Sequence, residues 1–169
     1  TVPNPNLKPE HARSYELAAE RHDEDGRIRV SLFQEDISNA LLSQSAPLVP
    51  GSNTLFSFVQ NVDRTRVRGI ELVTEQNNVI FDGLNLLGSL TFTESKTVKD
   101  TAFRAAEGKY LPQIPKLRGT AVATYRPAWL DEGKVAFTLA ARYSDRTFGT
   151  IDNSDPVSQT YQGFAGYLV

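Results

Sequence analysis

The stretch GLNLLGSLTFTES (residues 83–95) alternates apolar and polar side chains over almost its whole length. Leu84, Leu86, Leu90 and Phe92 occupy every second position of one register, and the positions between them are mostly Asn, Ser and Thr. A period of two places alternate side chains on opposite faces of an extended chain, whereas a helix requires a period of 3.6. This stretch therefore predicts a β-strand with one apolar face and one polar face.

The same alternation returns in five further stretches, and no stretch keeps a helical period over three turns. We therefore predict an all-β fold, an antiparallel up-and-down meander of about seven strands, in which the seventh begins near Tyr161 and is interrupted by the chain end. The five other complete strands are expected at residues 13–21, 27–37, 67–75, 117–126 and 134–144.

The predicted connections alternate in length along the chain. Short ones are expected at residues 22–26, 77–83 and 126–133, and long ones at roughly 38–62, 96–115 and 145–160. In an up-and-down meander, every second connection lies at the same end of the sheet. Tight turns at one end and long loops at the other are typical of transmembrane β-barrels, in which the long loops are extracellular.

The polar face of the predicted strands carries many charges, which would be costly in a dry protein core. They suit a water-filled or plugged lumen, with the opposite apolar face toward lipid. Tyr125 at a strand end and Trp129 in the next short turn are placed for an interfacial aromatic girdle. The charged residues of this face are Glu16, Glu20, Arg29, Glu71, Glu75, Arg118 and Arg142.

Composition excludes several functional classes. The 169 residues carry 18 Lys and Arg against 20 Asp and Glu, and a net charge of -2 gives no basic field for nucleic acid. Cysteine is absent, so disulfides and thiolate metal sites are excluded. No apolar run approaches the roughly 18 residues of a spanning helix. No catalytic arrangement, phosphate-binding loop or metal site is indicated, and we expect neither an enzyme nor a bound cofactor.

Four motifs in order resemble the barrels of TonB-dependent outer-membrane receptors. NPNLKPEHARSYEL (4–17) is similar to the N-P-x-L-K-P-E…S-x-E-L pattern of that family, and NVDRTRVRGIELVTE (61–75) to its N-x-x-x-x-R-x-x-G-x-E-L strand. GSLTFTESK (88–96) with GKYLPQIPKLRGTAVATYRP (108–127) resembles the next hairpin, and ARYSDRTFGTIDNSD (141–155) a later strand and loop. The resemblance covers essentially the whole chain.

The resemblance implies a closed barrel of roughly 22 strands around a globular plug. Residues 1–169 would form a partial barrel domain from its later part, with the plug and the final strands absent. The parent protein would lie in the outer membrane of a Gram-negative cell, in contact with lipid. It would bind and import a ferric siderophore or a similar large nutrient, energised by the TonB complex through the absent plug.

Two groups are candidates for a ligand vestibule. Arg64, Arg66 and Arg68 form a comb at alternating positions that could attract an anionic iron chelate. The alternative is that they pair with Glu71, Glu75 and neighbouring strands within the barrel wall. The second group is Asp152, Asn153 and Asp155, in which ordinary turn chemistry is the alternative to a ligand or calcium contact.

A soluble all-β binding module, such as a lectin-like sandwich, is the alternative function. Its sheets would have to bury one face, with the charged residues in solvent and the large apolar residues packed together. Those apolar residues are Leu86, Leu90, Phe92, Phe137 and Leu139. A third possibility is a passive, porin-like wall.

Overall fold

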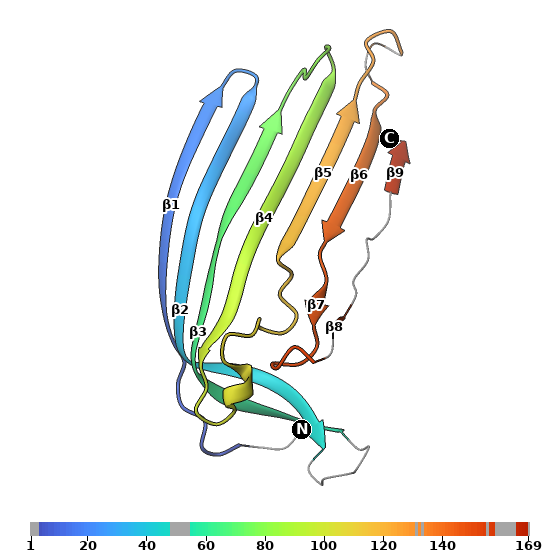
Figure 1. Cartoon of the computed structure of the whole chain (residues 1–169). Coiled ribbons are helices and arrows are strands. Elements are labelled where there is room, and N and C mark those ends of the chain that lie inside the picture. Colours follow the sequence, from blue (N-terminus) through green and yellow to red (C-terminus); the bar gives the residue numbers. More distant parts are fainter. Residues whose placement is uncertain are drawn as a thin grey trace.

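The computed structural model describes residues 4–47, 55–130, 132, 134–154, 156–157 and 165–168. Seven strands form one antiparallel sheet in chain order, as Figure 1 shows: β1 (His11–Asp23), β2 (Gly26–Pro47), β3 (Leu55–Gln76), β4 (Leu84–Lys99), β5 (Leu117–Tyr125), β6 (Phe137–Ser144) and β9 (Ala165–Leu168). A 3₁₀ turn, η1 (Arg104–Ala106), follows β4, and β7 (Thr147–Phe148) pairs with β8 (Pro156–Val157). The predicted meander is confirmed. Its last strand begins at Ala165, and the predicted start at Tyr161 lies outside the described residues.

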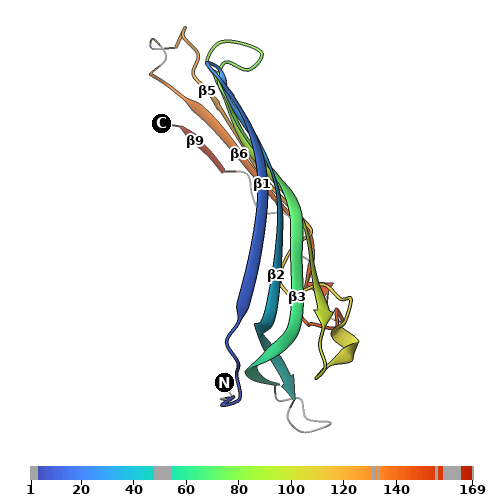
Figure 2. The ribbon, with the colours of Figure 1, turned by 90° about the vertical axis from the view of Figure 1, so that its left-hand side faces the viewer.

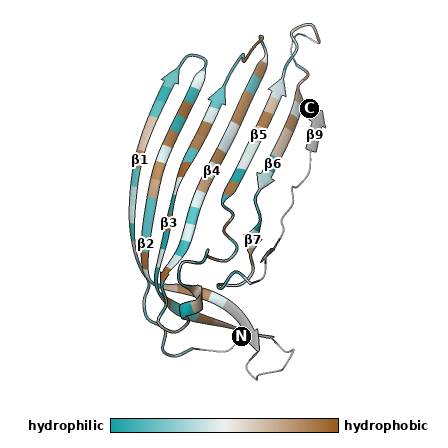
Figure 3. Cartoon of the chain, in the orientation of Figure 1, coloured by the Kyte–Doolittle hydropathy of each residue, from teal (hydrophilic) through white to brown (hydrophobic). Residues whose placement is uncertain are grey.

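Strand register places the alternating residues in rows across the sheet. Leu17, Leu32, Ile70 and Phe92 lie directly opposite one another in β1 to β4. Residues opposite in an antiparallel pair share a face, so these rows define an apolar face. Figure 3 shows the resulting alternation of hydrophobic and hydrophilic residues along the strands. The intervening residues form the polar face.

The sheet is a single bent layer, seen close to edge-on in Figure 2. Leu90, Phe92, Phe137 and Leu139 remain 47%, 51%, 42% and 53% exposed. The sandwich alternative is therefore wrong for the described part of the chain, because these side chains lie on an open face instead of packing in a core.

Beyond Ser38, β2 and β3 bend out of the plane of the main sheet, at the lower end in Figure 1. Asn39 adopts a φ of 53°, and the β2–β3 ladder skips its position while keeping one register from Ser38–Arg64 to Ala40–Val62. Asn tolerates this left-handed conformation better than most residues. In the neighbouring β3–β4 ladder the register shifts by one residue between Arg64 and Thr65, and an extra residue of this kind bends a strand. Ladder pairing then resumes as far as Pro47 and Leu55.

The loop predicted at 38–62 is therefore wrong over most of its length, because Ala40–Pro47 and Leu55–Val62 continue the ladder as the tip of one hairpin. Serines and asparagines in this stretch favour loops only weakly, and cross-strand pairing overrides them. We call residues 40–47 and 55–62 the bent hairpin.

The proline-rich N-terminal segment is fixed against this bend. The side-chain oxygen of Asn61 accepts from the Lys8 amide at 2.7 Å, and its NH₂ group donates to the Lys8 and Asn39 carbonyls at 3.0 and 2.8 Å. Glu10 Oε2 accepts from the Leu41 amide at 2.9 Å. The segment thus enters β1 in a fixed register, and the described contact of Glu10 is with a backbone amide of β2.

Candidate functional site

The polar face is organised by ion pairs between neighbouring strands. Arg29 Nη2 lies 2.9 Å from Glu16 Oε1 and its Nη1 lies 3.8 Å from Glu20 Oε2. Arg27 Nε lies 3.4 Å from Glu75 Oε2. The prediction that the charged residues share one face is confirmed, and hydroxyl-bearing side chains fill the space between them: Ser31, Thr65, Thr91, Ser95 and Thr97 are all buried.

The apolar face ends abruptly along the strands. One row beyond Leu17, Leu32, Ile70 and Phe92 lie Tyr15, Gln34, Arg68 and Glu94, and the row after that contains Asp36, Arg66 and Lys96. Neighbouring rows on one face are two residues, or about 7 Å, apart. The surface therefore changes from apolar to ionic over a single step.

The arginine comb lies in this ionic zone, on the same face as Ile70. Arg66 Nε lies 2.7 Å from Asp36 Oδ1, and Arg68 contacts Glu94 Oε2 through Nε at 2.6 Å and Nη2 at 2.5 Å. Arg64 follows on the same strand, opposite Ser38. The structure therefore shows Arg66 and Arg68 in ion pairs within the sheet, with partners on β2 and β4.

The predicted pairing of the comb with Glu71 and Glu75 is wrong, because odd-numbered positions of β3 point to the opposite face from Arg66 and Arg68. Glu75 instead pairs with Arg27, and Glu71 accepts a hydrogen bond from Thr91 at 3.2 Å.

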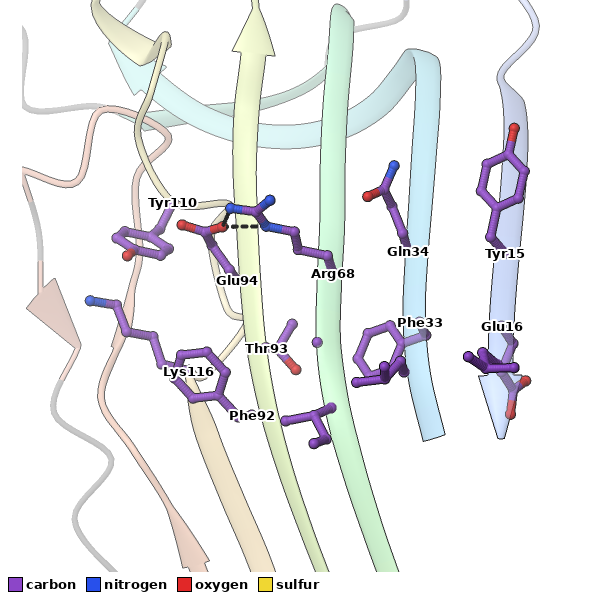
Figure 4. A pocket seen from close by; sticks show the side chains of 14 residues that line it. Tyr15, Glu16, Phe33, Gln34, Arg68, Phe92, Thr93, Glu94, Tyr110 and Lys116 are labelled. Atoms are coloured by element: carbon purple, nitrogen blue, oxygen red, sulfur yellow. Dashed lines mark hydrogen bonds and ion pairs between the residues drawn. The ribbon is translucent and has the colours of Figure 1, made fainter. Parts of the chain in front are cut away.

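A groove of about 740 Å³ lies where the apolar band meets the ionic zone (Figure 4). Its floor is the row that contains Leu17, Leu32, Ile70 and Phe92. Figure 4 shows the Arg68–Glu94 pair at its rim, with Tyr110 and Lys116 on one side and Tyr15 on the other. Lys116 Nζ lies 4.1 Å from the centre of the Tyr110 ring, within cation–π range.

Sequence reasoning missed Glu94, Lys96, Tyr110 and Lys116 as parts of one cluster. Tyr110 is brought to β4 by a bridge to Lys96, and the Thr97 amide donates to the Lys109 carbonyl at 2.9 Å. Residues of the predicted long connection at 96–115 are thus partly an extension of the sheet. Alternation continues from Phe92 to Glu94 and Lys96, and that pattern was the available signal.

The turn at residues 150–154, which we call the DNSD turn, is held by its own hydrogen bonds and is attached to the neighbouring connection. Asn153 Nδ2 donates to the Tyr110 carbonyl, and its Oδ1 accepts from the Tyr110 amide, both at 2.8 Å. Hydrogen bonds from the side chains of Thr150 and then Ser154 hold the pKa of Asp152 below its ordinary value. Asp155 lies outside the described residues. The described contacts of Asp152 lie within the turn, and those of Asn153 also join the turn to Tyr110.

Three connections meet at the end of the sheet that carries the bent hairpin. Ala40 and Val62 of the bent hairpin, Ala106 of η1 and Ile151 form one small buried cluster. Asp63 accepts hydrogen bonds from the amide and the hydroxyl of Thr101, which ties β3 to the turn before η1. These connections therefore stabilise one another as a packed cap at this end of the sheet.

Aromatic residues mark the opposite end. Phe81 and Tyr125 meet edge to face with ring centres 5.2 Å apart, and Trp129 in the β5–β6 connection is 77% exposed. The described part of the chain contains no helix of the length and apolarity required to traverse a bilayer.

The family model described as "TonB dependent receptor-like, beta-barrel" matches residues 1–169. The chain is 30% identical over 131 residues to a probable hemoglobin and hemoglobin-haptoglobin-binding protein of Haemophilus influenzae, covering 72% of the chain and 12% of that protein. It is 27% identical over 140 residues to an uncharacterized TonB-dependent receptor of the same organism, covering 83% of the chain and 38% of that protein. The chain thus spans well under half of either relative.

Solved structures with similar folds include the siderophore receptor PiuA of Acinetobacter baumannii, with a TM-score of 0.63 and 20% identity over 93% of the chain and 21% of that protein. The ferric yersiniabactin uptake receptor FyuA of Yersinia pestis also gives 0.63, with 17% identity over 94% of the chain and 21% of that protein. At these identities the likeness establishes the fold.

Proposed function

Because the chain belongs to the TonB-dependent receptor-like β-barrel family, a family of transport receptors, we propose that residues 1–169 form part of a barrel wall in a Gram-negative outer membrane. The barrel would be completed by further strands and would enclose a plug. One observation carries this proposal: a single sheet exposes a face of large apolar side chains, while the opposite face is ionic and hydroxyl-rich. Lipid suits the first face, and an aqueous lumen suits the second.

We further propose that the receptor binds and imports a large iron-bearing nutrient, with a ferric siderophore as the first candidate, and that TonB supplies the energy through the plug. Support comes from two structural neighbours, the siderophore receptor PiuA and the ferric yersiniabactin uptake receptor FyuA. The similarity to a probable hemoglobin-binding protein makes a haem protein the competing ligand. The proposal assigns no enzymatic activity to the barrel.

In this arrangement the packed cap lies at the extracellular mouth, with the short turns and the exposed Trp129 at the periplasmic rim. The bent hairpin, the connection at 100–116 and the connection at 145–154 would form part of the ligand vestibule. Direct ligand contact by Asp152, Asn153 and Asp155 stays a prediction, as does contact by Arg64. For Arg66 and Arg68, pairing within the wall competes with that role.

Growth of a strain that lacks the full-length receptor tests this function. We expect the complementing receptor to restore growth on one defined iron source, either a ferric siderophore or hemoglobin, and only when TonB is present. Replacing residues 100–108 by a short glycine–serine linker should weaken uptake, whereas the same linker in place of 78–82 at the opposite end should not. Growth without TonB, or equal uptake by both linker variants, would contradict the proposal.

A further inference from the structure

The groove on the apolar face has an apolar floor and a charged rim, and its floor lies on the face opposite the proposed lumen. Leu17, Leu32 and Phe92 in its floor are 72%, 50% and 51% exposed, so the floor is open to whatever lies against this face. In a soluble protein an exposed apolar patch of this kind marks a binding site. In a barrel wall it faces the acyl chains of the bilayer.

Positive charge exceeds negative charge on this face only when the row beyond the groove is included. Arg68, Lys116 and Glu94 line the groove, and the next row adds Arg66, Lys96 and Asp36. Glu16 also lines the groove, but it pairs with Arg29 on the polar face. Glu94 is shared, because Lys96 Nζ lies 2.7 Å from its Oε1 while Arg68 contacts its Oε2. One carboxylate therefore neutralises two cations only in part.

Lys116 is the cation best placed to receive an external anion. Its ammonium group lies over the Tyr110 ring, and within the described part of the chain it has no carboxylate partner at ion-pair distance. The backbone of Lys116 is fixed, because its carbonyl accepts from the Thr93 amide at 2.8 Å. The ring holds the charge in place without neutralising it.

From the floor and the rim together, we propose that this groove binds a phosphate-bearing membrane lipid. An acyl chain would lie along the apolar row, and the phosphate would contact Lys116 and Arg68 one row further along the strands. Charge complementarity selects an anionic head group, and clustered Lys and Arg at a membrane boundary are the usual means of holding one. This inference rests on the proposed placement of the apolar face in the bilayer, and it is independent of which nutrient the receptor imports.

Lipid retention by the full-length receptor tests the inference. The purified receptor is exchanged into micelles that contain bis-phosphorylated lipid A, phosphatidylglycerol or phosphatidylcholine, and bound lipids are counted by native mass spectrometry. We expect the phosphorylated anionic lipids to be retained in preference to phosphatidylcholine. Lys116→Ala and Arg68→Ala should each weaken retention about fivefold, since a basic residue at a membrane surface contributes about 1 kcal/mol.

Lys134→Ala is the matched control, because it removes a lysine outside the strands at the opposite end of the sheet. Glu94→Gln should strengthen retention, because it releases both Arg68 and Lys96 from their shared counter-ion. A purely structural role for this cluster predicts no gain in that variant. Any of four results would overturn the lipid site. Two concern the variants: unchanged lipid retention in Lys116→Ala, or a loss of retention in Lys134→Ala equal to that in Lys116→Ala. Two concern the ligand: retention of phosphatidylcholine equal to that of the anionic lipids, or complete displacement of the bound lipid by inorganic phosphate.

Failure of the lipid site and failure of the proposed function give different results. A receptor that retains lipid but supports no TonB-dependent growth would refute the transport function and leave the groove assignment intact. A receptor that imports iron normally but shows no charge-dependent retention would refute only the groove assignment.

Discussion

An arginine on the apolar face should lower the free energy of unfolding far more than an arginine on the polar face. Leu90 and Ser89 allow a direct comparison. They are neighbours in β4 and point to opposite faces, with Leu90 opposite Leu72 and Ser89 opposite Val73. Leu90→Arg would place a charge against hydrocarbon. Ser89→Arg would place the same charge among the polar side chains of the proposed lumen.

The position of Leu90 along β4 determines how much Leu90→Arg lowers the free energy of unfolding. The apolar band of β4 runs from Leu84 to Phe92, which is about 27 Å of strand at ~3.4 Å per residue. A strand tilt of about 40° reduces this length to roughly 20 Å of depth, close to the apolar band of a barrel, and places Gly88 at the centre. Leu90 then lies only about 5 Å from the midplane. Arginine costs about 2–4 kcal/mol at the midplane, so Leu90→Arg should cost about 2–3 kcal/mol.

The assay is the free energy of unfolding in urea of the full-length receptor folded into phosphatidylcholine vesicles. We expect Leu90→Arg to lower that free energy by about 2–3 kcal/mol and Ser89→Arg to change it by less than about 1 kcal/mol. Equal losses in both variants, or a greater loss in Ser89→Arg, would refute the assignment of the two faces.

Three further predictions follow from local geometry. Gly69→Ala should lower the unfolding free energy by about 1–3 kcal/mol, because an added Cβ would lie 2.1 Å from a backbone oxygen of the adjacent strand, whereas at Gly88 its nearest neighbour would be a methyl group at 3.3 Å. Asn153→Ala should speed amide hydrogen exchange at Tyr110, because both side-chain hydrogen bonds to that residue are lost. Asp152→Asn should loosen the DNSD turn at neutral pH, as measured by hydrogen exchange. Its effect should disappear as the pH falls through the lowered folded pKa of Asp152, because the stabilising carboxylate is then protonated in the parent protein as well.

Controls distinguish these effects from general instability. Gly88→Ala should be nearly neutral, and a loss equal to that of Gly69→Ala would contradict the steric reason. Exchange at Tyr110 that is unaffected by Asn153→Ala would show that the turn is held elsewhere. A difference between Asp152→Asn and the parent that persists unchanged at acidic pH would contradict the role of the carboxylate.

The number of strands in the sheet, and the face on which each side chain lies, were predictable because both can be read from a period of two. Leu84, Leu86 and Leu90 share the apolar face in the structure, and Glu16, Glu20 and Arg29 share the polar face, as their spacing predicts. Local alternation contains this information, and no long-range contact is required to read it.

The site was harder to predict, because it depends on which residues meet across strands. The bend near Asn39 coincides with a skipped rung of the β2–β3 ladder and a register shift in the β3–β4 ladder, and neither has a distinct sequence pattern. The partners of Arg66 and Arg68 are Asp36 and Glu94, which lie about 30 residues away in sequence and become neighbours only once the strand register is known. Tyr110 reaches the groove through backbone pairing in a stretch whose composition favours a loop.

The most direct test of the inside-out sheet is a cysteine scan of β4 in the full-length receptor embedded in vesicles. The chain has no cysteine, so single substitutions from 86 to 93 introduce one thiol each into this segment. We expect a fluorophore at 86, 88, 90 and 92 to be quenched by lipid-borne nitroxides. Thiols at 87, 89, 91 and 93 should escape that quenching. Quenching without a period of two, or with the opposite phase, would contradict the account.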